Sequence, residues 1–206
     1  MKGASGTEQR IREAAFRALA EHGYADLTIV DIGDELGQNP SLIYHYFDSK
    51  DELLLSMLDV FVDLFVTGVD EEPVHDPEAE LRQVVAQLLH PDPVRVQQVM
   101  ESPPTDIETA MSRVFVELWG HAIWDDDFRA ETTALEERVR EAITAILRTG
   151  IERGEFRPVD PKLTADHLFF LLMQATHTRA TTNWETATDR VEEIVDDIID
   201  DIARDD

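Results

Sequence analysis

Hydrophobic residues in this chain recur with the period of an α-helix along almost its whole length. Between residues 7 and 23, for example, Ile11, Ala15, Ala18 and Leu19 lie at i, i+4, i+7 and i+8, on one helical face. No stretch sustains the alternation of β-branched and polar residues that favours a half-buried strand. The sequence therefore predicts an all-α fold built from amphipathic helices.

Two short helices follow the first one and are separated by a glycine. Thr28 begins a helix of about two turns, as the first residue of a capping box, and Gly37 ends it. Asn39 caps a third helix, residues 39–47, and Pro40 takes its favoured first position. Two short helices joined around a glycine predict a helix-turn-helix. We therefore expect residues 1–48 to form an amino-terminal three-helix domain.

Residues 49–206 are expected to form a second helical domain, which begins with a long helix capped by Ser49. Further helices are predicted at 78–90, 106–124, 126–153, from 161 onward and at 191–202, with a loop or broken helix at 91–104. The helix from residue 161 has two apolar rows, one of Leu168, Leu171, Leu172 and Ala175 and one of Phe169, Phe170, Met173 and His177. Because one row can face its own core, the other predicts a dimer interface shared with the last helix.

Charge is distributed unevenly along the chain. There are 18 basic and 44 acidic residues, a formal net charge of -26. Residues 1–50 hold 5 basic and 8 acidic side chains, whereas residues 51–206 hold 13 and 36. The amino-terminal quarter is therefore close to neutral, which leaves nucleic acid open as its partner. Abundant acid with only three lysines resembles the composition of proteins from salt-accumulating halophiles.

Several classes of protein are excluded by what the sequence lacks. The absence of cysteine excludes disulfides, thiolate metal sites and a cysteine nucleophile. The longest apolar run, residues 168–173, is far shorter than the roughly 20 residues of a membrane span, and residues 1–12 lack the apolar core of a signal peptide. We expect a soluble cytoplasmic protein. No GxSxG, HExxH, phosphate-loop or dinucleotide motif is present, so we expect neither an enzyme nor a cofactor.

Residues 27–54, LTIVDIGDELGQNPSLIYHYFDSKDELL, resemble the signature of the TetR (tetracycline-repressor) family of transcription regulators. The upstream run EQRIREAAFRALAEHGY agrees with the first helix of that family, and ILRTGIERGEFRPVDP resembles a segment of its carboxy-terminal domain. The resemblance implies a homodimer whose helix-turn-helix binds a palindromic operator. It also implies a helical carboxy-terminal domain in which a small ligand lowers operator affinity, without identifying that ligand.

Carried onto this sequence, the resemblance places the third helix in the major groove of DNA. Tyr44 and His45 then take positions that touch phosphate or bases, and Ser41 and Leu42 lie nearest the base edges. A hydroxyl bonds several base edges and a leucine contacts a thymine methyl. Lys50 takes a position that meets a phosphate at the start of the next helix. The expected DNA contacts are Thr28, Asn39, Ser41, Leu42, Tyr44, His45 and Lys50.

A surplus of aromatic residues on helices that already have a core stripe predicts a largely apolar ligand pocket in the carboxy-terminal domain. The expected lining is Phe61, Phe65, Phe115, Trp119, His121, Trp124, Phe169, Phe170, Met173 and His177. A ligand touching Phe61 or Phe65 would tilt the helix that starts at Ser49 and change the spacing of the two recognition helices. The opposing interpretation is that these side chains pack the core and the dimer interface.

The sequence leaves three points open. Arg10, Arg12 and Arg17 on the first helix either contact phosphate or pair with neighbouring glutamates. His121 and Asp125, at i and i+4, have metal-ligand spacing, although we assign no metal site to them. The near-neutral amino-terminal domain and its donor-poor third helix leave a rival function, a helical dimeric ligand-binding or protein-interaction module with weak or lost DNA binding.

Overall fold

The structure, a computed structural model, describes residues 6–65 and 74–203, with side chains described in residues 6–58 and 74–203. Within these ranges there are nine α-helices, one 3-10 helix and no strand, and a single β-bridge joins Phe156 to Ala203. The predicted all-α fold is confirmed. None of the helices in this part of the chain combines the length and the apolar character needed to cross a membrane.

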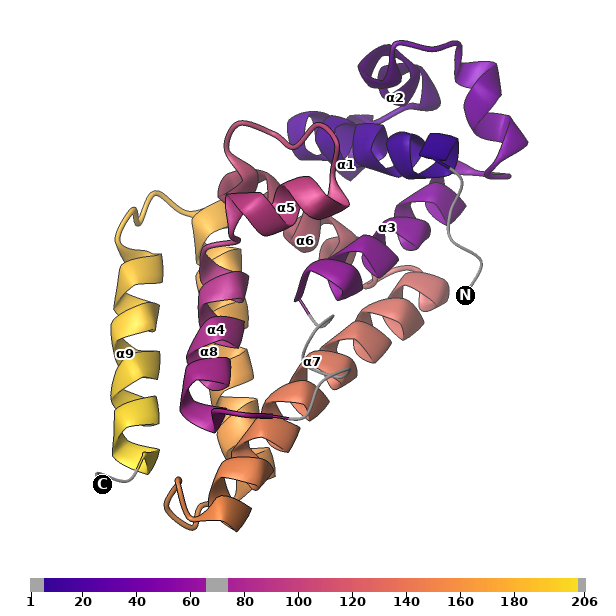
Figure 1. The fold of residues 1–206 in the computed structure, drawn as a ribbon. Helices are drawn as coiled ribbons and strands as arrows, with labels where there is room; N and C mark the ends of the chain where they lie inside the picture. Colours follow the sequence, from indigo (N-terminus) through magenta and orange to yellow (C-terminus); the bar gives the residue numbers. More distant parts are fainter. Residues whose placement is uncertain (1–5, 66–73, 204–206) are drawn as a thin grey trace. The chain divides into compact units, whose positions relative to one another are not determined.

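The helices follow the predicted order along the chain (Figure 1). They are α1 (Gly6–Asp26), α2 (Ile29–Leu36), η1 (Pro40–His45), α3 (Lys50–Phe65), α4 (Pro77–Leu89), α5 (Pro93–Val99), α6 (Ile107–His121), α7 (Asp126–Arg153), α8 (Pro161–Thr181) and α9 (Ala187–Ile202). The third short helix, η1, is a 3-10 helix, whose tighter turns suit so short a segment. The proline-rich stretch expected as loop or broken helix contains the short helix α5.

The helices pack into two compact units. The first unit comprises Met1–Phe61 and Pro93–Thr132, and the second comprises Val62–Asp92 and Thr133–Asp206. Helices α5 and α6 thus pack with the amino-terminal helices, although a long stretch of chain separates them in sequence. This division does not test the expected boundary after residue 48, which stays a prediction.

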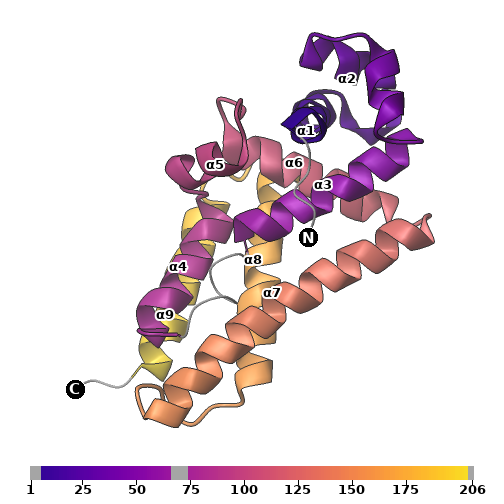
Figure 2. The ribbon, with the colours of Figure 1, turned by 45° about the vertical axis from the view of Figure 1, so that its right-hand side comes forward.

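In the first unit, one face of α1 is buried in the core. Its residues Ile11, Ala15, Ala18 and Leu19 are fully buried, which confirms the predicted apolar face. Helix α1 packs against both α2 and α6, and Figure 2 shows α6 beside α1. The helix-turn-helix therefore rests on a helix from much later in the chain.

In the second unit, α4, α8 and α9 pack against one another (Figure 1). In the predicted core row of α8, Leu168, Leu172 and Ala175 are buried and Leu171 is half-buried. The apolar stripe of α9 is buried at Val195 and Ile199 while its acidic side is exposed. Hydrophobic burial therefore determines which face of each helix is turned toward its neighbours.

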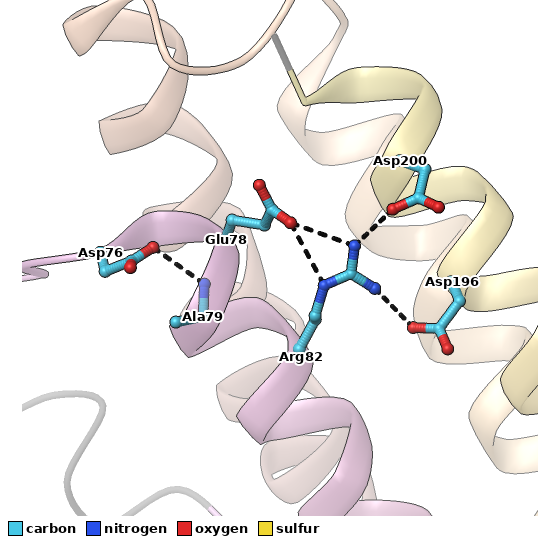
Figure 3. Close-up of polar contacts among 6 residues, drawn as sticks. All are labelled: Asp76, Glu78, Ala79, Arg82, Asp196 and Asp200. Carbon is cyan, nitrogen blue, oxygen red and sulfur yellow. Dashed lines mark hydrogen bonds and ion pairs between the residues drawn. The ribbon is translucent and has the colours of Figure 1, made fainter. Parts of the chain in front are cut away.

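Arg82 joins α4 to α9 at the surface of the second unit (Figure 3). Its guanidinium donates to Asp196 at 2.7 Å, to Asp200 at 2.5 Å and to Glu78 at 3.1 Å. Partial burial opposes the charge, but the hydrogen bonds that Arg82 donates to Asp200 and Glu78 outweigh this effect and raise the pKa of Arg82. We call these four residues the Arg82 cluster. Three carboxylates share one cation, so the cluster keeps an excess of negative charge.

Candidate nucleic-acid interface

Helix α2 begins with the capping box that the sequence predicts. The Thr28 hydroxyl accepts from the amide of Asp31 at 3.3 Å, and the Asp31 carboxylate accepts from the amide of Thr28 at 2.7 Å. The Thr28 hydroxyl also donates to that carboxylate at 2.6 Å. This side-chain hydrogen bond, followed by the backbone one, lowers the pKa of Asp31. Thr28 therefore fixes the start of the helix-turn-helix.

The turn between α2 and η1 depends on two glycines. Gly37 ends α2 in the left-handed conformation, with φ 67° and ψ 30°, which glycine adopts without strain. At Gly33, a Cβ atom would lie 2.9 Å from Cγ of Pro40, so only glycine allows η1 to approach α2 this closely. Asn39 then caps η1 by accepting from the amide of Ser41 at 2.9 Å. The orientation of η1 follows from these contacts.

Helix η1 separates its residues cleanly into buried and exposed sets. Ile43 is fully buried and Leu42 is half-buried, whereas Ser41, Tyr44 and His45 are exposed. Tyr44 is 57% exposed although it is a large aromatic residue, whereas Phe47 beyond it is buried in the core. One hydroxyl, one phenol and one imidazole thus lie on the free face of a short capped helix.

Lys50, expected at a phosphate, has its ammonium group in use within the first unit. Its Nζ donates to the carbonyls of Tyr24 at 3.0 Å and Leu27 at 3.1 Å, and it lies 4.1 Å from the centroid of the Tyr24 ring. Two of its three N–H donors are therefore committed to the connection between α1 and α2. A structural role for Lys50 stands beside the expected phosphate contact.

The three arginines of α1 differ in how much of their charge is neutralised. Arg12 pairs with Glu8 at 2.6 Å, the helical pairing that the sequence analysis considered. Arg17 pairs instead with Glu35 of α2 at 2.9 Å. Arg10 is exposed and has no hydrogen bond or ion pair to any residue in the described ranges. Of the three, only Arg10 lacks an ion pair within the described ranges.

Sequence reasoning missed a buried carboxylate on α1. Glu13 is 3% exposed and accepts from the amide N–H groups of Glu101 at 3.0 Å and Ser102 at 3.3 Å. The available signal was a glutamate placed directly before the apolar run Ala14–Phe16, which the sequence analysis interpreted only as an ion-pair partner of a neighbouring arginine. Its backbone partners lie 88 and 89 residues away, so no local pattern identifies them.

The expected pocket residues of α6 lie in the first unit, where several already have aromatic partners. Phe115 and Trp119 stack with ring centroids 3.6 Å apart. His121 stacks on Tyr24 at 3.8 Å and meets Phe128 edge-on at 4.5 Å. Trp124, by contrast, is 86% exposed. Asp125, the suggested metal partner of His121, uses its carboxylate to accept from the amides of Asp127 and Phe128 at the start of α7.

The expected pocket residues of α8 lie in the second unit and differ in burial. Phe169 is buried with the core, under the guanidinium of Arg140 at 5.7 Å. Phe170 is 63% exposed, Met173 is half-buried and His177 is exposed. The side chains of Phe61 and Phe65 lie outside the described residues. The second row of α8 is therefore mostly uncovered in a single chain.

Two cavities in the described part of the chain have linings rich in polar and charged residues. One, of about 590 Å³, lies between α7 and α8 and is lined by Glu137, Arg140, Glu141, Thr144, Arg148, Lys162 and Asp166. The other, of about 420 Å³, lies in the first unit and is lined by Arg17, Ala20, Glu21, Glu35, Pro104, Asp106, Thr109, Ala110 and Arg113. None of the ten residues expected to bind a ligand lines either cavity.

Comparison with known families matches both parts of the chain. Residues 11–57 match the family model described as bacterial regulatory proteins, tetR family, and residues 98–198 match that of a tetracyclin repressor-like C-terminal domain. A TetR transcription regulator from Haloarcula marismortui has a similar structure, with a TM-score of 0.81 and 27% identity over 98% of this chain and 100% of that one. A transcriptional regulator from Saccharomonospora viridis, solved in complex with choline, is also similar. Its TM-score is 0.77 and its sequence identity is 24%, over 98% of this chain and 100% of that one.

Two sequence relatives add detail. The transcriptional repressor AcnR of Corynebacterium efficiens is 23% identical over 201 residues, 97% of this chain and 94% of that protein. The regulator BetI of Brucella anthropi is 39% identical over 46 residues, 22% of this chain. This chain aligns with only 24% of the length of that BetI protein, so the similarity to it is confined to one segment.

Proposed function

Because this chain belongs to the TetR family of transcriptional regulators, we propose that it represses transcription from a palindromic operator, which it binds as a homodimer and leaves when a small apolar ligand binds. The family is non-enzymatic and binds DNA. The observation that carries the proposal is the exposed face of η1, where Ser41, Tyr44 and His45 lie on a capped helix whose opposite face, at Ile43, is buried.

Contacts to DNA divide into those that position the protein and those that distinguish sequences. Arg10 supplies a phosphate contact, because its charge is not neutralised within the described ranges. His45 and Ser41 supply base contacts, and Leu42 adds contact with a thymine methyl. Tyr44 and Asn39 contribute polar groups at the edge of η1. The remaining N–H donor of Lys50 contacts a DNA phosphate. Thr28 contributes through the start of α2.

The dimer forms through α8 and α9. Phe170 is 63% exposed and Leu163 is 59% exposed on α8, and Ile194 is exposed on α9. Large apolar side chains gathered on two neighbouring helices are typical of a surface that another protein covers. A second copy of the same surface, related by a twofold axis, completes a four-helix interface. Two recognition helices related by the same axis then match a palindromic operator.

The test of DNA binding begins with selection of bound fragments from genomic DNA at high salt, which yields an operator. His45→Ala is then expected to weaken operator binding more than binding to random DNA. Arg10→Gln is expected to weaken both alike and to lower the salt slope by about one unit. Arg138→Gln, the same charge change at an exposed site on α7, is the matched control. Failure to select any fragment would favour the rival module without DNA binding.

The ligand is expected to bind in the carboxy-terminal region, beside the stacked rings of Phe115 and Trp119 on α6. A ligand lowers operator affinity only if it binds the DNA-free conformation more tightly than the DNA-bound one. The experiment screens hydrophobic compounds, and choline because a protein of similar fold was solved with it, for a rise in melting temperature. A compound that stabilises the protein is then titrated against the operator complex.

Two variants locate the pocket. Trp119→Ala is expected to weaken binding of the compound, because it removes the ring that stacks on Phe115. Trp184→Ala, at an exposed tryptophan outside the expected pocket, is the matched control. Full affinity in Trp119→Ala would show that the compound binds elsewhere.

We further propose that the protein works in concentrated salt. The formal net charge of -26 makes acidic side chains repel one another, and added salt screens that repulsion. The melting temperature is therefore expected to rise from low to molar KCl. A melting temperature that stays constant or falls with KCl would contradict adaptation to salt, whatever the DNA-binding result.

A further inference from the structure

Glu13 is a carboxylate placed among apolar residues of α1 and almost completely removed from water. A buried carboxylate is stable only when hydrogen bonds replace its hydration. Here the amides of Glu101 and Ser102 donate to one oxygen at 3.0 Å and 3.3 Å, and the side-chain amide of Gln9 donates to the other at 3.4 Å. The groups that replace water around Glu13 are therefore mostly backbone amides of the connection between α5 and α6.

Glu13 is the middle member of a row on one face of α1. Gln9, Glu13 and Arg17 lie at i, i+4 and i+8, so their side chains follow one another along the helix. Gln9 donates to the carbonyl of Val99 at 2.9 Å, and Arg17 donates to that of Ser102 at 2.9 Å. We call this set of hydrogen bonds between the row and residues 99–102 the α1 latch.

The latch also reaches the second helix of the helix-turn-helix. The same Arg17 guanidinium that contacts Ser102 donates to Glu35 of α2 at 2.9 Å. The cavity of about 420 Å³ opens beside this end, since Arg17 and Glu35 are among its lining residues. Glu13 does not line it. The middle of the latch, at Glu13, is therefore almost completely buried, whereas its Arg17 end is half-buried beside the cavity.

A second anchor holds the far end of α1. Gly23 interrupts the helix with φ 71°, and the amide of the next residue, Tyr24, donates to the Glu117 carboxylate at 3.0 Å. A Cβ atom on Gly23 would lie 3.1 Å from that carboxylate. His121 then stacks on the Tyr24 ring. Helix α1 is therefore held near both ends by the segment from residue 99 to residue 121.

We propose that Glu13 is a positioning residue for DNA recognition. Its buried carboxylate fixes residues 99–102 on α1, so that the helix-turn-helix and α6 move as one body and present η1 at a single orientation. The inference rests on the proposed operator binding. It adds the prediction that a displacement of residues 99–102 moves α1 directly. The same displacement moves α2 through the Arg17 contacts with Ser102 and Glu35.

The test uses the full chain with Glu13→Gln, which keeps the size of the side chain and removes its charge. Glu21→Gln is the matched control, because it makes the same charge change at an exposed position of the same helix. Electrostatics alone predicts slightly tighter DNA binding in both variants, since each removes a negative charge near the DNA. Loss of positioning predicts weaker binding in Glu13→Gln only.

Three quantities are measured well below the melting temperature. Amide hydrogen exchange at Glu101 and Ser102 is expected to speed up in Glu13→Gln. Operator affinity is expected to fall by about tenfold. This is the loss expected if only about a tenth of the molecules hold η1 in the orientation that binds DNA. The third measurement uses operators whose half-sites are moved apart one base pair at a time. As the spacing grows, the affinity of Glu13→Gln is expected to fall less steeply than that of the parent protein or of Glu21→Gln.

The outcomes separate this inference from the proposed function. A parent protein that binds no operator refutes the proposed function and the inference with it. If the parent binds and exchange at Glu101 and Ser102 is unchanged in Glu13→Gln, the carboxylate does not hold the segment. If exchange speeds up while affinity and spacing tolerance match those of Glu21→Gln, Glu13 is structural only. Either of the last two results overturns the inference and leaves operator binding intact.

Discussion

The α1 latch and the Arg82 cluster join distant segments by opposite physical means. In the latch, one buried carboxylate accepts from backbone amides 88 and 89 residues away. In the cluster, one partly exposed guanidinium donates to carboxylates on α9 that are 114 and 118 residues away. The Glu13 carboxylate of the latch is almost completely buried, whereas the cluster has excess acid at the surface (Figure 3).

The difference teaches where each contact gains its strength. Hydrogen bonds to a buried charge depend on geometry and are hardly screened, and the donors cost free energy if the acceptor is removed. Ion pairs at the surface contribute little each and weaken with salt. An acidic protein thus gains a fixed orientation from the first kind of contact and salt-dependent stability from the second.

Glu13→Ala is expected to give the largest effect. It leaves two backbone amides without their acceptor, and the free energy of unfolding should fall by about 3 kcal/mol. The loss should be similar in low salt and in molar KCl, because the Glu13 carboxylate is almost completely buried. Urea unfolding at both salt concentrations measures it, with Glu21→Ala as control for the helix. A loss that disappears in KCl would show that the latch is solvated like the cluster.

Arg82→Gln is expected to give an intermediate effect that depends on salt. Glu78, Asp196 and Asp200 then repel one another without their shared cation, and stability in low salt should fall by about 1 kcal/mol. Molar KCl should remove most of the loss through screening. The control is Arg190→Gln, which breaks a single exposed pair with Glu193 on α9. Equal losses in low and high salt would contradict the contrast drawn with the latch.

Tyr24→Phe is expected to give the smallest effect and to change how stability depends on pH in alkaline solution. Burial, followed by the hydrogen bond from its hydroxyl to Asp51 and the charge of that carboxylate, raises the pKa of Tyr24. The folded state therefore favours the neutral phenol, so this contribution is intact below pH about 10 and is lost as the pH rises above it. Tyr24→Phe should flatten the fall in stability above that pH.

All three tyrosines of the chain, Tyr24, Tyr44 and Tyr46, lie in the first unit, so the alkaline experiment reports on that unit. Tyr44→Phe is the control because its ring is exposed. Unfolding free energies from pH 8 to pH 11 give the comparison. Identical profiles for Tyr24→Phe and the parent protein would show that the Tyr24 phenol makes no difference to folding.

The helix-turn-helix could be predicted from local residues because local interactions form it. Thr28 and Asp31 cap α2 across three residues, Gly37 ends it by adopting a positive φ, and Asn39 caps η1 across two residues. Periodicity also predicted the buried face of α1 and the buried row of α8. Each of these features needs only neighbours within a few turns, so the sequence contains the whole cause.

The burial of the expected pocket residues could not be predicted from local sequence. Phe169 and Phe170 are adjacent and equally apolar, yet one is buried and the other exposed, because the rotation of α8 against its neighbours decides between them. Trp124 is a large aromatic residue of the kind that lines ligand pockets, yet its side chain is exposed to solvent. Residue type predicts which side chains can line a pocket, and packing decides which of them face inward.

The sequence by itself therefore determined the helices, their caps, the helix-turn-helix and the family. Tertiary structure alone decided that α6 packs on α1, that Glu13 accepts from Glu101 and Ser102, and that Lys50 donates to the carbonyls of Tyr24 and Leu27. Helix propensity and capping act over a few residues and are encoded beside the residues they affect. A buried carboxylate finds its donors only after the chain has brought distant backbone together, and no local pattern records which backbone that is.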